Sequence, residues 1–114
     1  MANKKSNVTF EVSEDFLSAT EAAQDKELRL FFAENPTARV EPKEKGQTFP
    51  ALRRQIGKRF NISQRICEGG SAKDVLAFAR ANGGGERDVT AHLVGGFSHS
   101  SKFYGKPFIS IHAA

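Results

Sequence analysis

The sequence predicts an α+β protein: a single small domain with an N-terminal strand, about three helices and a C-terminal antiparallel β-hairpin. The length of 114 residues suits one domain, and 39% hydrophobic residues with ten Phe supply one core. Apolar residues alternate near both ends of the chain, whereas helical apolar spacing fills the middle. Separate runs of strand and helix are typical of an α+β domain with an antiparallel sheet.

The N-terminal part of the chain predicts a tail followed by a strand. Residues 1–6 are polar and basic, and we expect them to form a flexible tail. The α+β domain then spans residues 7–114. In the stretch "NVTFEVS", Val8, Phe10 and Val12 alternate with polar residues, which predicts a half-buried strand.

The first predicted helix covers residues 19–34. Ser18, followed three residues later by Glu21, forms a capping box, whose side chains satisfy free N–H groups of the first turn. Pro36 ends the helix because the residue before a proline avoids the helical region. The stretch 37–42 then predicts a short strand.

The second predicted helix covers residues 49–60 and follows a solvated loop. Pro50 suits its first turn, where a missing N–H costs little. Leu52, Ile56 and Phe60 lie four residues apart and form one apolar stripe. The charged residues on the other sides of this helix are all basic: Arg53, Arg54, Lys58 and Arg59.

The remaining elements are a third helix and the hairpin. A second capping box begins at Ser71 and predicts a helix to about Asn82, which the glycines at 83–85 end as a C-cap. Strand-like runs follow at 87–97 and 106–113, and the stretch between them predicts the connecting loop.

Positive charge is concentrated in the second part of the chain. The net charge is +4. Residues 1–48 hold seven basic and nine acidic residues, net −2, so residues 49–114 hold ten and four, net +6. Between residues 51 and 65 five basic residues stand without an acid, which is enough to neutralise several phosphates. Such clustering is typical of proteins that bind an anionic partner.

The composition also excludes several classes of protein. The single Cys67 cannot form an internal disulfide and excludes a Cys-rich zinc site. We find no signal peptide and no apolar run of transmembrane length, so we expect a cytoplasmic location and no membrane contact. We find no phosphate-loop, dinucleotide or hydrolase motif, and we expect neither a cofactor nor a metal.

The stretch "IGKRFNISQRIC" resembles the core of a helix-turn-helix. Gly57 supplies the small residue where the two helices cross, and Asn61 falls at the turn. Gln64 and Arg65 would begin the second helix, with side chains that suit base edges. The resemblance implies DNA binding, with the C-terminal hairpin as a wing. The glycine pair after Glu68 stops the second helix after one turn, so we expect phosphate contact rather than base reading.

The same stretch is similar to the KH RNA-binding module, whose helix–loop–helix carries Ile-Gly-x-x-Gly. Gly57 matches the first glycine of that motif, whereas Phe60 stands in place of the second. This resemblance implies close approach of the backbone to RNA. Because the second glycine is missing, we rank it below the helix-turn-helix.

The predicted hairpin loop, residues 97–106, offers a second nucleic-acid contact. Lys102 and Lys106 can hold phosphates, and Tyr104 can stack on an unpaired base. We expect Phe103 to fold under the loop and close the core instead.

Two histidines indicate an alternative, enzymatic function. On the two strands of the predicted hairpin, His92 and His112 would share one face. Two histidines with a lysine can act as acid, base and charge stabiliser in metal-independent RNA cleavage. His99 with Lys102 or Lys106 would complete such a site.

The leading hypothesis is a small basic accessory or regulatory protein that binds nucleic acid, DNA or RNA, or a nucleoprotein. Its size fits the regulatory proteins of phages and plasmids. Two alternatives stay open: the ribonuclease, and an interaction module or inhibitor that docks an acidic surface of a larger complex. The oligomeric state is open too. The predicted contact residues are Arg53, Arg54, Lys58, Arg59, Gln64, Arg65, Lys102, Tyr104 and Lys106.

Overall fold

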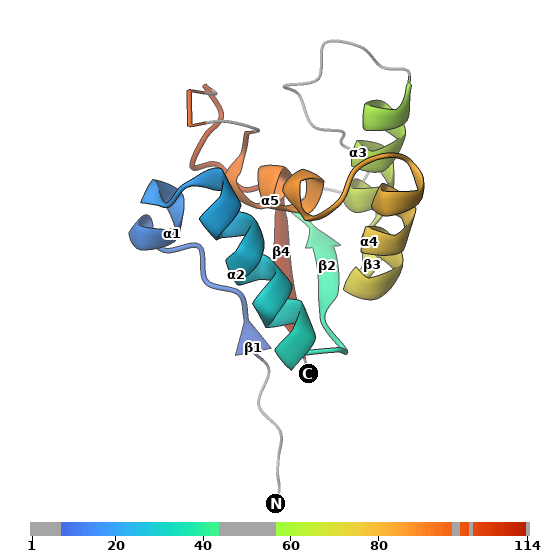
Figure 1. The fold of residues 1–114 in the computed structure, drawn as a ribbon, viewed down its shortest axis with the longest axis horizontal. Coiled ribbons are helices and arrows are strands. Elements are labelled where there is room, and N and C mark those ends of the chain that lie inside the picture. Colours follow the sequence, from blue (N-terminus) through green and yellow to red (C-terminus); the bar gives the residue numbers. More distant parts are fainter. Residues whose placement is uncertain (1–7, 44–56, 97–98, 101, 114) are drawn as a thin grey trace, which may run out of the picture.

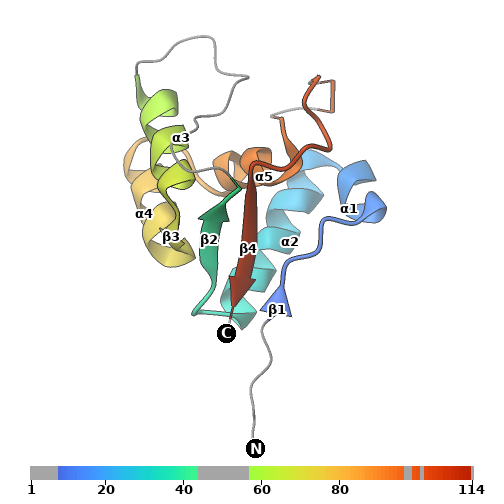
Figure 2. The same ribbon diagram turned by 180° about the vertical axis from the view of Figure 1, so that it is seen from behind.

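A four-stranded antiparallel sheet with helices packed on one face makes up the fold of the computed structural model (Figures 1 and 2). The structure describes residues 8–43, 57–96, 99–100 and 102–113. The predicted α+β class is therefore confirmed. The predicted tail, residues 1–6, lies outside the described residues. The strands are β1 (Val8–Thr9), β2 (Arg39–Pro42), β3 (Gly70–Ser71) and β4 (Ile109–Ala113).

The last strand of the chain occupies an inner position in the sheet. The strand order is β1–β4–β2–β3, so the strands from the two ends of the chain are paired. β4 pairs with β1 through Thr9 and His112, and with β2 through Val40 and Ile111. Alternate residues of β4 are buried, which places one face of the sheet against the core. The predicted strands at 7–13 and 37–42 are confirmed as the shorter β1 and β2.

Five helices lie in the described residues, where the sequence predicts about three. The predicted helix at 19–34 is confirmed as α2, although Thr20 rather than Ser18 is its N-cap and accepts the N–H of Ala23 at 3.2 Å. No helix of the described residues is long and apolar enough to span a membrane. The helices are α1 (Glu14–Ser18), α2 (Glu21–Glu34), α3 (Lys58–Glu68), α4 (Ala72–Ala81) and α5 (Glu86–Val94).

α3 corrects the prediction of a turn in the basic stretch. The predicted helix at 49–60 lies mostly outside the described residues, but the part that is described continues unbroken past Phe60. Asn61 donates its backbone N–H to the carbonyl of Gly57 at 3.0 Å, as in any helix, so no turn lies there. Both the helix-turn-helix and the KH interpretation are therefore wrong. Burial of the following residues outweighs the turn preference of Asn61: Ile62, Ser63, Ile66 and Cys67 are all buried.

α5 corrects the predicted hairpin. Residues 87–94 belong to a helix, so the described residues between α4 and β4 contain no strand that could form the hairpin, and the predicted wing is wrong as well. The apolar alternation in this segment is misleading because the helix is buried all round. Residues 89–94 are no more than 1% exposed, and a helix without a solvated face shows no clear helical period.

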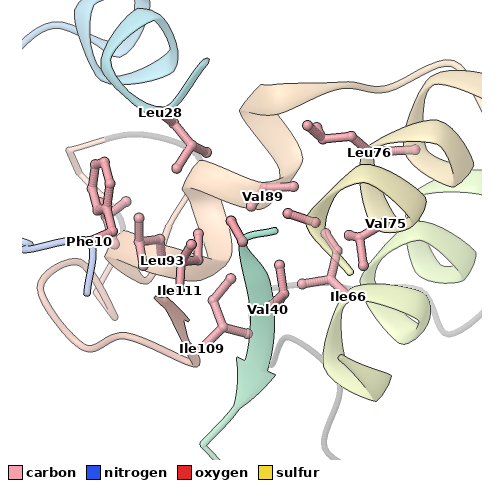
Figure 3. Close-up of a cluster of buried hydrophobic side chains, with 14 of the residues drawn as sticks. Phe10, Leu28, Val40, Ile66, Val75, Leu76, Val89, Leu93, Ile109 and Ile111 are labelled. Carbon is pink, nitrogen blue, oxygen red and sulfur yellow. The ribbon is translucent and has the colours of Figure 1, made fainter. Parts of the chain in front are cut away.

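The hydrophobic core lies between the sheet and the helices, with α5 at its centre (Figure 3). At one edge Phe10 meets Phe16 and Phe31 edge-on, at centroid distances of 5.1 and 5.2 Å. Each of the larger elements contributes to the core: Leu28 from α2, Val40 from β2, Ile66 from α3, Val75 from α4, Val89 and Leu93 from α5, and Ile109 and Ile111 from β4.

Candidate nucleic-acid interface

A cleft of about 630 Å³ opens between the start of α3 and the loop that joins α4 to α5. We call it the α3 cleft. Lys58 and Arg59 of α3 and the glycines 83–85 of the loop both contribute to its lining, together with the first residues of α5. The complete lining comprises Asp25, Lys58, Arg59, Ile62, Asn82, Gly83, Gly84, Gly85, Glu86, Arg87 and Asp88.

α3 begins at this cleft without a capping side chain. Its N-cap residue, Gly57, has a φ of +101°, a conformation that favours glycine, and it has no side chain with which to bind the N–H groups of the first turn. The first turn also contains no acidic residue. The positive end of the helix dipole is therefore reinforced by the charges of Lys58 and Arg59, both of which are exposed.

The loop between α4 and α5 packs too closely for a larger residue at Gly84. A Cβ at this position would collide with the carboxylate of Asp88 and would lie 3.0 Å from Cδ1 of Ile62. The carboxylate of Asp88 in turn accepts the backbone N–H of Gly85 at 3.0 Å and caps the start of α5. The glycines thus bring the end of α4 and the start of α5 close to α3.

The acidic side chains of the cleft are each bound to another group of the protein. Asp88 caps α5, and Asp25 lies 3.4 Å from the guanidinium of Arg87. Asp25 Oδ1 and Arg87 Nε are buried without a hydrogen bond among the described residues, so this pair is an electrostatic contact. Glu86 binds Arg80 at 2.6 Å. Burial alone would raise the pKa of Glu86, but hydrogen bonds from the backbone and from Arg80 hold it below the ordinary value.

The charged groups of the cleft are divided between its two sides. The lining holds three basic and three acidic residues; the acidic ones lie on the side formed by α2 and α5, whereas the side formed by α3 carries the exposed Lys58 and Arg59. An anion that enters there meets two positive side chains and the positive end of a helix, which is a favourable combination for phosphate.

The remaining predicted contact residues on the basic stretch are placed differently. Gln64 is exposed on α3, further along the helix. Arg65 is half-buried, and its guanidinium donates to the carbonyl of Gly69, just beyond the end of α3, at 2.7 Å. Arg65 therefore also caps its own helix. Arg53 and Arg54 lie outside the described residues.

The other predicted contacts lie in the segment between α5 and β4. This segment and the start of α3 lie at the same end of the molecule (Figures 1 and 2). Lys102 and Lys106 are exposed, and Nζ of Lys102 lies 5.3 Å from the ring centre of Phe103. Phe103 itself is half-buried and meets Phe108 edge-on at 6.3 Å, but it does not belong to the core cluster, against which Tyr104 packs instead.

Tyr104 ties the C-terminal segment to the N-terminal helices. Its hydroxyl donates to the carbonyl of Leu17 at 2.6 Å and accepts a hydrogen bond from the fully buried Gln24 at 2.7 Å. Its ring lies 4.8 Å from the ring of His99. These contacts give Tyr104 a structural role that the sequence did not indicate, whereas its stacking on a base stays a prediction.

The structure does not place His92 and His112 on one sheet face, so that prediction is wrong. His92 lies on α5 and is 1% exposed, whereas His112 lies on β4 beside Glu41. The backbone carbonyl of His92 binds the N–H of Phe108 at 2.8 Å, and His112 lies four residue steps, roughly 13 Å, further along the chain from Phe108. The predicted shared face depended on a strand where α5 stands.

The buried His92 has a defined hydrogen-bond pattern. Its Nδ1 lies 2.8 Å from the carbonyl of Asp88, which can only accept, so Nδ1 carries the proton. Its Nε2 then accepts from the hydroxyl of Ser63 at 2.7 Å. Burial lowers the pKa of His92 to about 4, so the ring is neutral at physiological pH.

Sequence reasoning missed the part of the cleft that the loop and α5 contribute. The signal was present, because a glycine run followed by Glu86 and Asp88 is typical of a helix start. The strand predicted for this segment concealed it. Among the residues that the structure describes, no group of three His, Cys, Asp or Glu side chains can hold a metal ion.

Comparisons with known proteins give no match, so the function is inferred from the geometry of the cleft. No protein-family model, no curated protein and no solved structure matches this chain.

Proposed function

We propose that this protein binds nucleic acid through its phosphates at the α3 cleft. The observation that supports the proposal is the convergence of Lys58, Arg59 and the uncapped start of α3 on one cleft. The carboxylates of the same cleft are already paired with groups of the protein. Phosphate contacts of this kind provide affinity and position a nucleic acid, whatever its sequence.

The arrangement favours backbone contact over base reading. The middle of α3 packs into the core through Ile62 and Ile66, so only its opposite face is available to a nucleic acid. Its exposed polar side chains, among them Gln64, lie beyond the cationic first turn. We therefore expect binding that varies little with sequence and falls steeply with salt. Lys102 and Lys106, which are exposed in the segment between α5 and β4, offer additional phosphate contacts.

Fluorescence anisotropy with labelled mixed-sequence oligonucleotides of DNA and of RNA, over a series of salt concentrations, tests the proposal. Lys58→Ala should weaken binding to every sequence alike and reduce the slope of log K against log salt by about one. Lys26→Ala is the matched control, because Lys26 is an exposed lysine of α2 outside the cleft. Equal slopes for the two variants would contradict the proposal.

A charge reversal separates loss of contact from loss of fold. In Lys58→Glu an acidic residue stands at the first position of α3, where it interacts favourably with the helix dipole. This variant should be at least as helical as the natural protein by circular dichroism and yet bind nucleic acid more weakly than Lys58→Ala. Retained binding by Lys58→Glu would exclude the α3 cleft as the contact.

A further inference from the structure

A second hollow lies between α2 and α4 and differs in character from the α3 cleft. We call it the α2–α4 groove. Its volume is about 410 Å³, and apolar side chains supply a larger share of its lining than in the α3 cleft. The lining comprises Arg29, Phe32, Ala33, Asn35, Pro36, Ala72, Lys73, Leu76, Arg80 and Glu86.

Each of the two helices contributes one stripe to this groove. From α2 come Arg29, Phe32 and Ala33, which are three and four residues apart and so share a face. From α4 come Lys73, Leu76 and Arg80 at the same kind of spacing. Both stripes therefore combine apolar residues with cationic ones.

The charges along the groove do not cancel. Arg29 and Arg80 both bind Glu86, at 3.4 and 2.6 Å, so two cations share one carboxylate. The side chains of the two arginines are 60% and 58% exposed, whereas that of Glu86 is 15% exposed. Lys73 adds another exposed cation. The lining thus has three basic residues against one acidic residue, and its positive groups face solvent.

We propose that the α2–α4 groove docks an acidic amphipathic segment of a partner protein. Leucine or phenylalanine side chains of such a segment would pack on Phe32, Ala33 and Leu76, and its Asp or Glu residues would meet the cations of the rim. Such a segment matches the groove, because its acidic residues meet the cations and its apolar residues meet the apolar floor. The arrangement corresponds to the binding of an amphipathic helix in a hydrophobic groove. The apolar floor favours a protein over nucleic acid, whose phosphates gain nothing from apolar contact.

A fluorescein-labelled synthetic peptide tests the proposal on the full chain. The probe has leucines at helical i, i+3, i+4 and i+7 spacing and glutamates elsewhere, and binding is followed by anisotropy. Binding should be saturable and weaken with salt, since charges at a rim mainly change the association rate. A peptide with lysine in place of glutamate, and one with the leucines scrambled off one face, should both bind at least about tenfold more weakly.

Two matched variants locate the binding surface. Ala33→Glu places a carboxylate on the exposed part of the groove floor and should weaken peptide binding by at least about tenfold. Ala77→Glu makes the same exchange at an exposed position of α4 that does not line the groove, and it should bind the peptide as the natural protein does. Both positions are exposed, so the fold should be kept, which circular dichroism checks.

Three results would overturn the proposal. These are failure of the peptide to bind, equal binding of the glutamate and lysine peptides, and equal effects of Ala33→Glu and Ala77→Glu on peptide binding. If Ala33→Glu instead weakened the binding of oligonucleotides, the groove would belong to a nucleic-acid surface. Lys58→Glu should leave peptide binding unchanged, so failure of the nucleic-acid proposal and failure of this one are distinguishable.

Discussion

His92 shows how the interior fixes the chemistry of a single residue. The ring accepts the hydroxyl of Ser63 and donates to the carbonyl of Asp88, so the neutral form satisfies both nitrogens. Protonation would require Nε2 to donate as well, toward the same buried hydroxyl, without water to solvate the charge. The folded state therefore binds this proton less readily than the unfolded chain, in which the pKa is near 6.5.

This difference predicts a contribution of His92 to acid unfolding. The folded pKa, about 4, lies below the unfolded value, so the stabilisation is complete above about pH 6.5 and is lost as the pH falls towards 4. Its full size is about 3 kcal/mol. Urea unfolding at several values of pH in this window should show the free energy of unfolding decreasing towards acid. His92→Gln should be less stable at neutral pH but lose less on acidification, and parallel curves would refute this explanation.

Tyr104 supports a second expectation for a single residue. Tyr104→Phe removes the donor to Leu17 and the acceptor for Gln24, whose amide is fully buried. Leaving these groups without a partner should lower the free energy of unfolding by about 1–3 kcal/mol. Urea denaturation measures this loss. A change within a few tenths of a kcal/mol would mean that the hydroxyl does not link the two segments in solution.

Among the elements, the end of α5 makes the strictest demand on one residue type. Gly95 has a φ of +93°, and a Cβ there would collide with the carbonyl oxygen of Phe103 and lie 2.7 Å from that of Lys106. Gly105 has a similar φ of +89°, but no atom lies within 4 Å of the position its Cβ would take. Substitution of Gly105 therefore tests the cost of the positive φ alone, whereas substitution of Gly95 tests that cost together with a steric collision.

Alanine substitutions at these two glycines should give different losses. Gly105→Ala should cost about 1–2 kcal/mol, from the positive φ alone. Gly95→Ala should cost at least about 1–3 kcal/mol more, because backbone atoms must also shift. Thermal or urea unfolding of both variants provides the measurement. Equal losses of stability would show that the backbone from Phe103 to Lys106 moves aside at little cost.

α3 and α5 also show which elements local sequence can predict. α2 and α4 have mixed surfaces, so the sequence predicts both helices, although Thr20 rather than Ser18 caps α2 and the side chain of Ser71 makes no capping hydrogen bond. α5 has no solvated face, and α3 contains a residue that prefers turns, so tertiary burial decides both. Within the candidate site, the clustering of basic residues in the sequence predicts Lys58 and Arg59. The opposite wall, including Gly84 and Arg87, could not be placed until α5 was known to be a helix.

The whole molecule is organised around a strand from the end of the described chain. β4 pairs with both β1 and β2, and its buried residues meet the helices. β1, in contrast, is a two-residue strand at the edge of the sheet, with both residues exposed. Loss of the first element should therefore leave the sheet largely intact, whereas loss of the last should not.

Two truncated chains test this asymmetry. A chain that stops at Phe108 lacks β4 and should not fold cooperatively, because α5 and β2 lose the strand on which they pack. Of the described elements, a chain that starts at Phe10 lacks only β1, and it should retain a cooperative transition with reduced stability. Amide dispersion in NMR spectra and urea denaturation distinguish the two outcomes. A folded chain without β4 would contradict this account.

The inner position of β4 also has a consequence for biosynthesis. A ribosome makes β1, β2 and the five described helices before it makes residues 109–113, so the nascent chain carries these helices and an incomplete sheet. During that interval β2 lacks the strand that will pair with it, and Val40 lacks its neighbour Ile111. The sheet of this domain is therefore expected to be completed only after residues 109–113 have emerged from the ribosome.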